Sequence, residues 1–304
     1  MKESGKIWMN GKLVPFANAK VHVLTHALHY STSVFEGIRC YSTPEGPAIF
    51  RLDDHVDRMF RSAKMYSMKI RYTKGQIAGA IVDTVRACRL KECYIRPLAY
   101  YGYGEMGLTP TKNSVDVSIS CWPWKMGESK AGKFSGARCM VSSWIRIDPR
   151  AQPVQAKAAA NYSNAALARV EALENGYDEA IMLNGDGRVA EGSAENIFIC
   201  TDGRILTPPL STGCLSGITR DSVIKIAAAD GIDISEYDLY RADLYTADEI
   251  FMTGTAAEVK SVTQVDRTKI GSGRMGRVTK ALQKSFVGAA MGKDKRFRQW
   301  LTFI

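Results

Sequence analysis

The sequence contains no apolar run long enough to span a bilayer, and its first residues, MKESGKIWMNGK, lack the apolar core of a signal peptide. Its seven cysteines are spread along the chain without a CxxC pair. This spacing favours neither a disulfide framework nor a zinc ribbon. We therefore expect a cytoplasmic protein with reduced thiols and no membrane association.

Complete signatures of nucleotide and metal binding are also missing. There is no Walker A pattern, and the two G-x-G-x-x-G matches at 102–107 and 271–276 lack the surrounding strand, helix and acidic residue of a dinucleotide site. Each predicts a turn, so a nicotinamide-dependent dehydrogenase remains only a weak alternative. The helically spaced His22, His26 and His29 have no cysteine or carboxylate nearby to complete a ligand set, so we predict no metal site.

The charge of the chain is strongly basic, with a formal net charge of +10 at pH 7. The basic residues are dispersed apart from a small cluster in the tail, and no nucleic-acid-binding module is recognisable. We predict that this surface attracts small anionic metabolites rather than nucleic acid.

The length of 304 residues, 45% of them hydrophobic, exceeds what one typical core uses and predicts two domains. The stretch MGESKAGKFSGA is polar, rich in glycine and without periodicity. It predicts a small N-terminal domain over 1–125, an interdomain loop over 126–135 and a larger C-terminal domain over 136–304.

Local patterns favour an α+β fold. Asn10-Gly11 between two apolar stretches predicts a hairpin near the start. Apolar spacing predicts helices over 52–66, 76–90, 164–174 and 219–230, and strands over 93–101 and 115–122. Strand-rich segments interrupted by single helices, without regular βαβ alternation, favour α+β over a doubly wound sheet.

Lys157 lies among alanines in the segment AKAAANYSN. A lysine used in Schiff-base chemistry needs a lowered pKa and a slot that a bulky aldehyde can enter, and small neighbours provide the slot. Judged by this segment alone, an exposed lysine is the commoner outcome.

Two short segments further on suit a phosphate group. Gly217-Ile218-Thr219 precedes a predicted helix, and Thr255 with Glu258 in GTAAE has capping-box spacing. Backbone N–H groups at a helix start form a ready site for a phosphate. Each segment alone is more often a plain helix cap.

Several blocks occur together in one order: HALHYSTSVFEGIRCY, CYIRP, KAAANY, EGSAENIF, TPPLSTGCLSGITR and ADEIFMTGTAAE. With these blocks the sequence resembles the branched-chain amino acid aminotransferases, fold type IV enzymes dependent on pyridoxal phosphate. The resemblance runs from WMNGKLV to GRMGRVTKALQ. It implies a small N-terminal α/β domain and a larger, strand-rich C-terminal domain that carries the cofactor lysine.

The resemblance implies a role for each cofactor contact. Lys157 would form a Schiff base with pyridoxal phosphate and then act as the base that moves a proton at the substrate Cα. Glu191 would pair with the pyridine nitrogen, Tyr162 would bind the phenolate oxygen, and Arg58 would bind the phosphate. The full implied set is Arg58, Lys157, Tyr162, Glu191, Glu195, Asn196, Gly217, Ile218, Thr219, Gly254 and Thr255.

Substrate contacts follow from the same resemblance, with amino acids and 2-oxo acids, including glutamate and 2-oxoglutarate, as partners. Arg96 at the pocket edge would bind the glutamate side-chain carboxylate in a bidentate manner. Tyr30 and Leu108 would reach in from a neighbouring subunit, which implies a homodimer as the minimal unit and allows a larger homo-oligomer. The implied substrate set is Tyr30, Phe35, Gly37, Tyr94, Arg96, Leu108, Trp124, Thr255, Ala256 and Ala257.

One segment departs from the family pattern, because Lys125-Met126-Gly127-Glu128 follows Trp124 where relatives commonly have Gly and a nearby Tyr. The sequence leaves the preference among leucine, isoleucine and valine open. We expect ping-pong transamination between a branched-chain amino acid and 2-oxoglutarate. The alternatives are a D-amino acid aminotransferase or an aminodeoxychorismate lyase of the same fold, and a catalytically silent binding protein.

Overall fold

The computed structural model describes residues 5–124 and 136–304, so the predicted interdomain loop lies outside the described residues. The chain divides into two compact units. The first comprises residues 5–124, 156–160 and 290–304, and the second comprises 136–155 and 161–289. This division differs from the predicted boundaries in two places, because the segment with Lys157 and the last 15 residues both group with the first unit.

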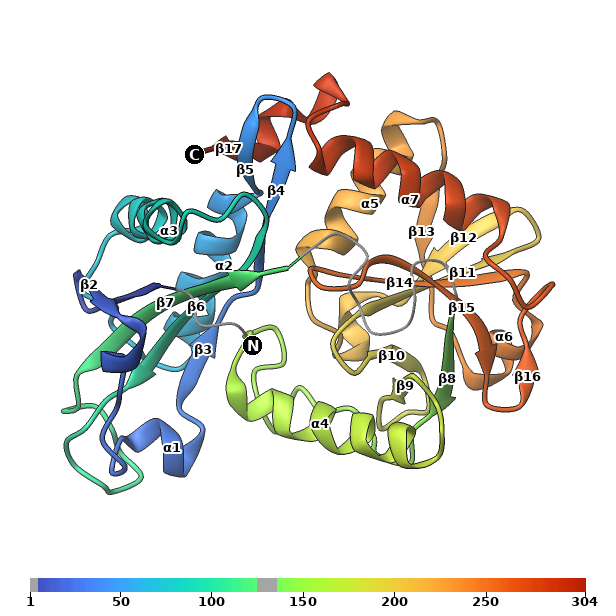
Figure 1. The fold of residues 1–304 in the computed structure, drawn as a ribbon. Coiled ribbons are helices and arrows are strands. Elements are labelled where there is room, and N and C mark those ends of the chain that lie inside the picture. Colours follow the sequence, from blue (N-terminus) through green and yellow to red (C-terminus); the bar gives the residue numbers. More distant parts are fainter. Residues whose placement is uncertain (1–4, 125–135) are drawn as a thin grey trace. The chain divides into compact units, whose positions relative to one another are not determined.

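The first unit contains a mixed set of strands and helices (Figure 1). Its elements are β1 (Lys6–Met9), β2 (Lys12–Pro15), η1 (Phe16–Asn18), α1 (His26–Tyr30), β3 (Ser33–Phe35), β4 (Ile38–Thr43), β5 (Gly46–Phe50), α2 (Leu52–Met65), α3 (Lys74–Cys88), β6 (Cys93–Tyr101), β7 (Val115–Pro123), η3 (Lys295–Trp300) and β17 (Leu301–Phe303). The strands form one sheet in the order β17-β5-β4-β6-β7-β1-β2, with β3 paired to β6.

The core of this unit lies between its sheet and the helices α2 and α3. Val56 and Met59 of α2 and Ile81 of α3 pack with buried strand residues such as Ile95. Each such side chain stabilises the unit by about 1.5–3 kcal/mol on burial. Ala158 belongs to the same buried cluster, so the segment around Lys157 is anchored in this core.

The second unit is built on a second sheet. Its elements are β8 (Ala137–Val141), α4 (Ala159–Glu174), β9 (Glu179–Leu183), β10 (Val189–Gly192), β11 (Asn196–Thr201), β12 (Arg204–Thr207), η2 (Leu210–Thr212), α5 (Ile218–Ala229), β13 (Ile234–Glu236), α6 (Arg241–Thr246), β14 (Glu249–Gly254), β15 (Glu258–Val265), β16 (Thr268–Lys269) and α7 (Arg277–Ala290). The strand order is β10-β9-β8-β15-β14-β11-β12-β13, with β16 paired to β15. The predicted α+β class is therefore confirmed.

Local predictions hold where the sequence signal is strong. Asn10 and Gly11 both have positive φ, at 48° and 96°, and they join β1 to β2 as the hairpin prediction requires. The predicted strand over 93–101 coincides with β6. Helix α3 starts two residues earlier than predicted, because Thr73 and Gln76 form a capping box.

Two local predictions differ from the structure. Helix α4 begins at Ala159 rather than 164. Thr255 and Glu258 cap no helix, because Thr255 lies in the turn between β14 and β15 and Glu258 begins β15 with φ of 58°. None of the helices within residues 5–124 and 136–304 combines the length and apolar composition needed to cross a bilayer.

Candidate active site

The predicted site residues fall into two sets, one in each unit. In the first unit, the backbone of Lys157 is held from two sides. Its N–H donates to Ser62 Oγ of α2 at 3.0 Å, and its carbonyl accepts from the N–H of Phe35 at the end of β3 at 3.0 Å. Ala158 forms a bridge to Val34. The fold therefore fixes the lysine backbone between one strand and one helix.

The surroundings of the Lys157 amine disfavour its charged form. Burial, followed by the Arg58 guanidinium, lowers its pKa to about 8 from an ordinary value of 10.5. The amine nitrogen lies 5.0 Å from the centre of the Phe35 ring. About one tenth of an amine with a pKa near 8 is neutral at pH 7, roughly 300 times the fraction of an ordinary lysine. A nucleophilic lysine needs this property.

Arg58 lies next to a carboxylate that was not predicted as a site residue. Its Nε donates to Glu36 Oε1 at 2.7 Å and its Nη2 donates to Glu36 Oε2 at 2.8 Å. His55 Nδ1 lies 2.7 Å from the same Oε2. The three side chains are buried. The predicted phosphate ligand is thus fixed by a two-pronged ion pair.

Arg96 lies in an aromatic cage beside Lys157. Its guanidinium carbon is 4.8 Å from the centre of the Phe35 ring and 5.5 Å from that of Tyr94. Tyr94 in turn stacks on Trp122, with ring centres 5.1 Å apart. Arg96 Nε is buried and has no hydrogen-bond partner among the described residues. A buried N–H donor of this kind suits a ligand acceptor.

Gly37 gives the Tyr94 side chain its space. A Cβ built on Gly37 would overlap the Tyr94 hydroxyl and lie 2.9 Å from Tyr94 Cζ. Gly37→Ala is therefore expected to push the Tyr94 ring away and to raise KM for the amino donor about tenfold or more, while the unfolding temperature changes little. Steady-state kinetics with thermal unfolding tests this, and Gly79→Ala, where nothing lies within 4 Å of the new Cβ, is the control. An unchanged KM would remove Tyr94 from the substrate contacts.

The remaining predicted residues of the first unit lie near its surface or near the loop after β7. Tyr30 and Leu108 are exposed, and the Tyr30 hydroxyl donates to the Met106 carbonyl at 3.0 Å. The Trp124 ring centre lies 5.6 Å from that of Tyr94. The departure at Lys125-Met126-Gly127-Glu128 lies outside the described residues.

The three helically spaced histidines lie in separate environments. His26 Nδ1 lies 2.8 Å from Thr32 Oγ1 and its Nε2 lies 2.9 Å from the Gly107 carbonyl. His29 Nε2 contacts the Val23 carbonyl, and His22 Nδ1 accepts from the Leu24 N–H. Over the part of the chain that the structure describes, no three metal-ligating side chains gather in one place.

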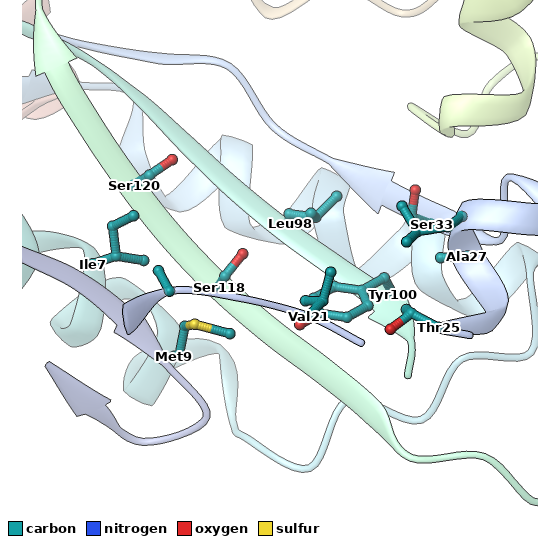
Figure 2. Close-up of a pocket in the computed structure, with 12 residues that line it drawn as sticks. Ile7, Met9, Val21, Thr25, Ala27, Ser33, Leu98, Tyr100, Ser118 and Ser120 are labelled. Atoms are coloured by element: carbon teal, nitrogen blue, oxygen red, sulfur yellow. The ribbon is translucent and has the colours of Figure 1, made fainter. Parts of the chain in front are cut away.

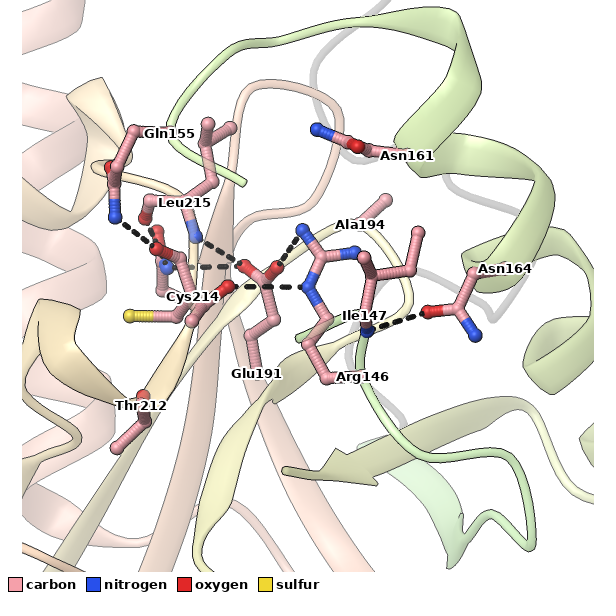
Figure 3. Close-up of polar contacts among 12 residues, drawn as sticks. Arg146, Ile147, Gln155, Asn161, Asn164, Glu191, Ala194, Thr212, Cys214 and Leu215 are labelled. Carbon is pink, nitrogen blue, oxygen red and sulfur yellow. Dashed lines mark hydrogen bonds and ion pairs between the residues drawn. The ribbon is translucent and has the colours of Figure 1, made fainter. Parts of the chain in front are cut away.

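In the second unit, Glu191 lies at the centre of a buried polar cluster (Figure 3). Arg146 Nη2 lies 2.9 Å from Glu191 Oε1, and the Leu215 N–H donates to Glu191 Oε2 at 3.1 Å. Asn196 Nδ2 donates to the Leu215 carbonyl at 2.9 Å. Arg146 and Glu191 are 5% and 6% exposed, so the pair is shielded from water. Arg146 was not predicted as a site residue, because its partner is distant in the sequence.

The start of helix α5 lies against this cluster. Gly217 is the N-cap residue and provides no side-chain cap, so the first amide groups of α5 have no capping side chain as acceptor. A Cβ on Gly217 would overlap Asn196 Oδ1, so only glycine permits this close approach. Thr219 in the first turn is buried. The predicted residues Asn196, Gly217 and Thr219 are thereby brought together.

The turn after β14 approaches the same region of the sheet. Thr253 pairs with Asn196 across β14 and β11, and Thr253 Oγ1 is buried without a partner in the described residues. A Cβ on Gly254 would lie 3.2 Å from Glu195 Cγ. Glu195 and Gly254 are therefore neighbours, as predicted. Thr255 and Ala257 are partly buried and Ala256 is exposed, whereas Tyr162 lies partly buried on α4.

Two sheets of this topology, a lysine with a lowered pKa and a buried, ion-paired glutamate are features of one enzyme family. The family model for class IV amino-transferases matches residues 33–265. The chain belongs to the class IV aminotransferases.

Its relatives share one printed activity. The branched-chain-amino-acid aminotransferase of Escherichia coli (strain K12) is 43% identical over 301 residues, covering 99% of this chain and 97% of the relative. The enzyme of the same name from Pseudomonas aeruginosa is 44% identical over 300 residues, with the same coverage.

Solved structures of the branched-chain amino acid aminotransferase from T.th. are also similar. The structures with pyridoxamine 5'-phosphate and with N-(5'-phosphopyridoxyl)-L-glutamate match at TM-scores of 0.97 and 0.95. Both are 44% identical and cover 100% of this chain and 99% of their own. A third structure of that enzyme, complexed with 4-methylvaleric acid, matches at 0.95. The predicted family is confirmed.

Proposed function

We propose that the chain transfers amino groups between branched-chain amino acids and 2-oxoglutarate by a ping-pong reaction, with pyridoxal 5'-phosphate as cofactor. The observation that carries the proposal is the Lys157 amine, with a backbone fixed on both sides and a pKa lowered to about 8. The relatives named for this reaction are similar over nearly the whole chain.

The residues present fit the three reactive parts of pyridoxal phosphate. A neutral amine suits its aldehyde, and Lys157 provides one. A buried carboxylate suits its pyridinium nitrogen, and Glu191 provides one. A helix start without a side-chain cap suits its phosphate, and Gly217 begins such a helix. The buried, unpartnered Thr253 Oγ1 adds a hydroxyl in this region of the described chain.

Each residue then has a definite part in the reaction. When bound, the cofactor supplies the carbonyl that takes the amino group and the ring that accepts electrons from the substrate Cα. Lys157 holds the cofactor between turnovers and, as a neutral amine, moves a proton at the substrate Cα. Glu191 keeps the pyridine nitrogen protonated, and Arg146 keeps Glu191 ionised and oriented.

The remaining contacts would bind and orient. Arg96, whose Nε has no partner among the described residues, would take the side-chain carboxylate of glutamate, while the aromatic rings around it line a space for branched aliphatic side chains. The other cofactor contacts that we propose are Arg58, Tyr162, Glu195, Asn196, Ile218, Thr219, Gly254 and Thr255. The other substrate contacts are Tyr30, Phe35, Gly37, Tyr94, Leu108, Trp124, Ala256 and Ala257.

A homodimer as the minimal active unit is part of the proposal. Exposed apolar side chains near α1 support it, among them Val23 at 70% and Leu108 at 81% exposure. A groove beside them is lined by Ile7, Met9 and Leu98 (Figure 2). Apolar surface of this kind is typical of an interface. Light scattering of the purified chain measures the state directly, and a monomer with full activity would contradict it. The cytoplasmic location stays a prediction.

Borohydride reduction followed by a panel of amino donors tests the proposed function. We expect a yellow protein that loses its colour on reduction and carries the reduced cofactor on the peptide with Lys157. L-leucine, L-isoleucine, L-valine and L-glutamate should each act as donor. Turnover of D-alanine without L-leucine would indicate the D-amino acid enzyme instead, and protein that takes up no pyridoxal phosphate would overturn the assignment.

A further inference from the structure

Glu36 is a buried carboxylate with an unusually complete set of donors. Both of its oxygens accept from Arg58, at 2.7 and 2.8 Å. Its Oε2 also lies 2.7 Å from His55 Nδ1 and accepts from the Gly37 N–H at 3.3 Å. Its side chain has no exposed surface. A buried charge is retained at such a position only when partners compensate for the lost water.

The charge states of the cluster follow from these contacts. Burial alone would raise the pKa of Glu36, but Arg58 and His55 outweigh it and hold that pKa well below its usual range. Burial lowers the pKa of His55 despite the adjacent carboxylate, so the ring is neutral at pH 7 and donates from Nδ1. The cluster therefore consists of one anion, one cation and one neutral donor.

The cluster joins the same two elements that hold Lys157. Glu36 directly follows Phe35, whose N–H donates to the Lys157 carbonyl. His55 and Arg58 lie on α2, two turns and one turn before Ser62, which accepts from the Lys157 N–H. The Glu36 contacts thus tie the end of β3 to α2 on either side of the lysine backbone.

We propose that Glu36, supported by His55, is a positioning residue that orients Arg58 toward the cofactor phosphate and sets the charge around the Lys157 amine. The proposal rests on the proposed function, because it assigns Arg58 to that phosphate. The bidentate pair fixes the plane of the guanidinium, and with it the direction of its opposite edge. Glu36 also offsets part of the Arg58 charge, which otherwise acts fully on the nearby amine.

Glu36→Gln tests the proposal because it keeps the shape and removes the charge. The dissociation constant of pyridoxal phosphate from the full chain is expected to rise about 10- to 100-fold, the range for losing charge-assisted hydrogen bonds. Glu45→Gln is the matched control, since Glu45 forms an exposed pair with Arg298 at the protein surface. It should leave the constant unchanged.

A second readout reports on the amine itself. Reductive methylation of Lys157 in the cofactor-depleted chain, followed by mass spectrometry across pH, gives the midpoint at which the amine becomes neutral. Without the Glu36 charge, Arg58 repels the ammonium form more strongly, so the midpoint should move below the wild-type value near pH 8. The charged and titratable groups that act on this amine are Glu36, His55, Arg58, Tyr94 and Arg96.

His55→Gln keeps the ion pair and covers the case in which Glu36→Gln does not fold. It should weaken pyridoxal phosphate binding about 3- to 10-fold, as expected for losing one hydrogen bond to a charged group, with little change in the Lys157 midpoint. Wild-type binding constants in every folded variant would overturn the proposal. If the wild-type chain itself fails to bind the cofactor through Lys157, the proposed function fails instead.

Discussion

Lys157→Ala is expected to lower kcat by about 10⁴-fold or more, because one side chain provides both the covalent link to the cofactor and the proton transfer at Cα. The fold should persist. The contacts of residue 157 with Ser62 and Phe35 are made by its backbone, and alanine continues the run of alanines that follows. Pyridoxal phosphate should still bind noncovalently, since the phosphate contacts remain.

The measurement combines turnover with L-leucine, cofactor content after dialysis, and borohydride reduction. The variant should contain cofactor that dialysis removes and that borohydride does not attach to the protein. Lys260→Ala is the matched control, because burial also lowers the pKa of Lys260 although it lies on β15 of the second unit. Turnover of the Lys157 variant near the wild-type rate would remove the lysine from the reaction.

Much of the local structure could be predicted from the sequence, because its causes are local. The Asn10-Gly11 hairpin follows from two residues that tolerate positive φ, and β6 follows from a run of apolar and aromatic residues. Helix α4 was predicted to start too late, since its first residues are alanines without amphipathic contrast. The pairing of β17 with β5 joins segments near opposite ends of the chain, and no local pattern contains it.

The candidate site divides in the same way. Lys157 and Glu191 belong to sequence blocks that resemble a known family, whereas Glu36 and Arg146 were not identified. Both of these residues act through a partner that is distant in sequence but close in the fold. Arg58 was placed beside the apolar face of its helix by periodicity, and the structure buries it because Glu36 compensates its charge. The partners of buried ions are a tertiary property.

Arg146→Met is expected to destabilise the second unit by about 3–5 kcal/mol, since it leaves Glu191 as a buried carboxylate without the Arg146 charge. The unfolding temperature should fall by roughly 6–20 °C. The Leu215 N–H remains as a donor but carries no full charge. The deficit should shrink as the pH falls, because protonation removes the uncompensated charge. Thermal unfolding of the cofactor-depleted chain measures this without the added stability of a bound ligand.

The double variant Arg146→Met/Glu191→Gln separates stability from function. Removing both members of a buried pair costs far less than removing one, so most of the lost stability should return. Turnover should stay low, because no carboxylate then faces the pyridine nitrogen. Arg188→Met is the control, since its partners Asp186 and Asp238 are largely exposed and such pairs contribute at most about 1 kcal/mol. A double variant no more stable than the single one would show that Arg146 stabilises the unit by packing, and that the charge of Glu191 does not need it.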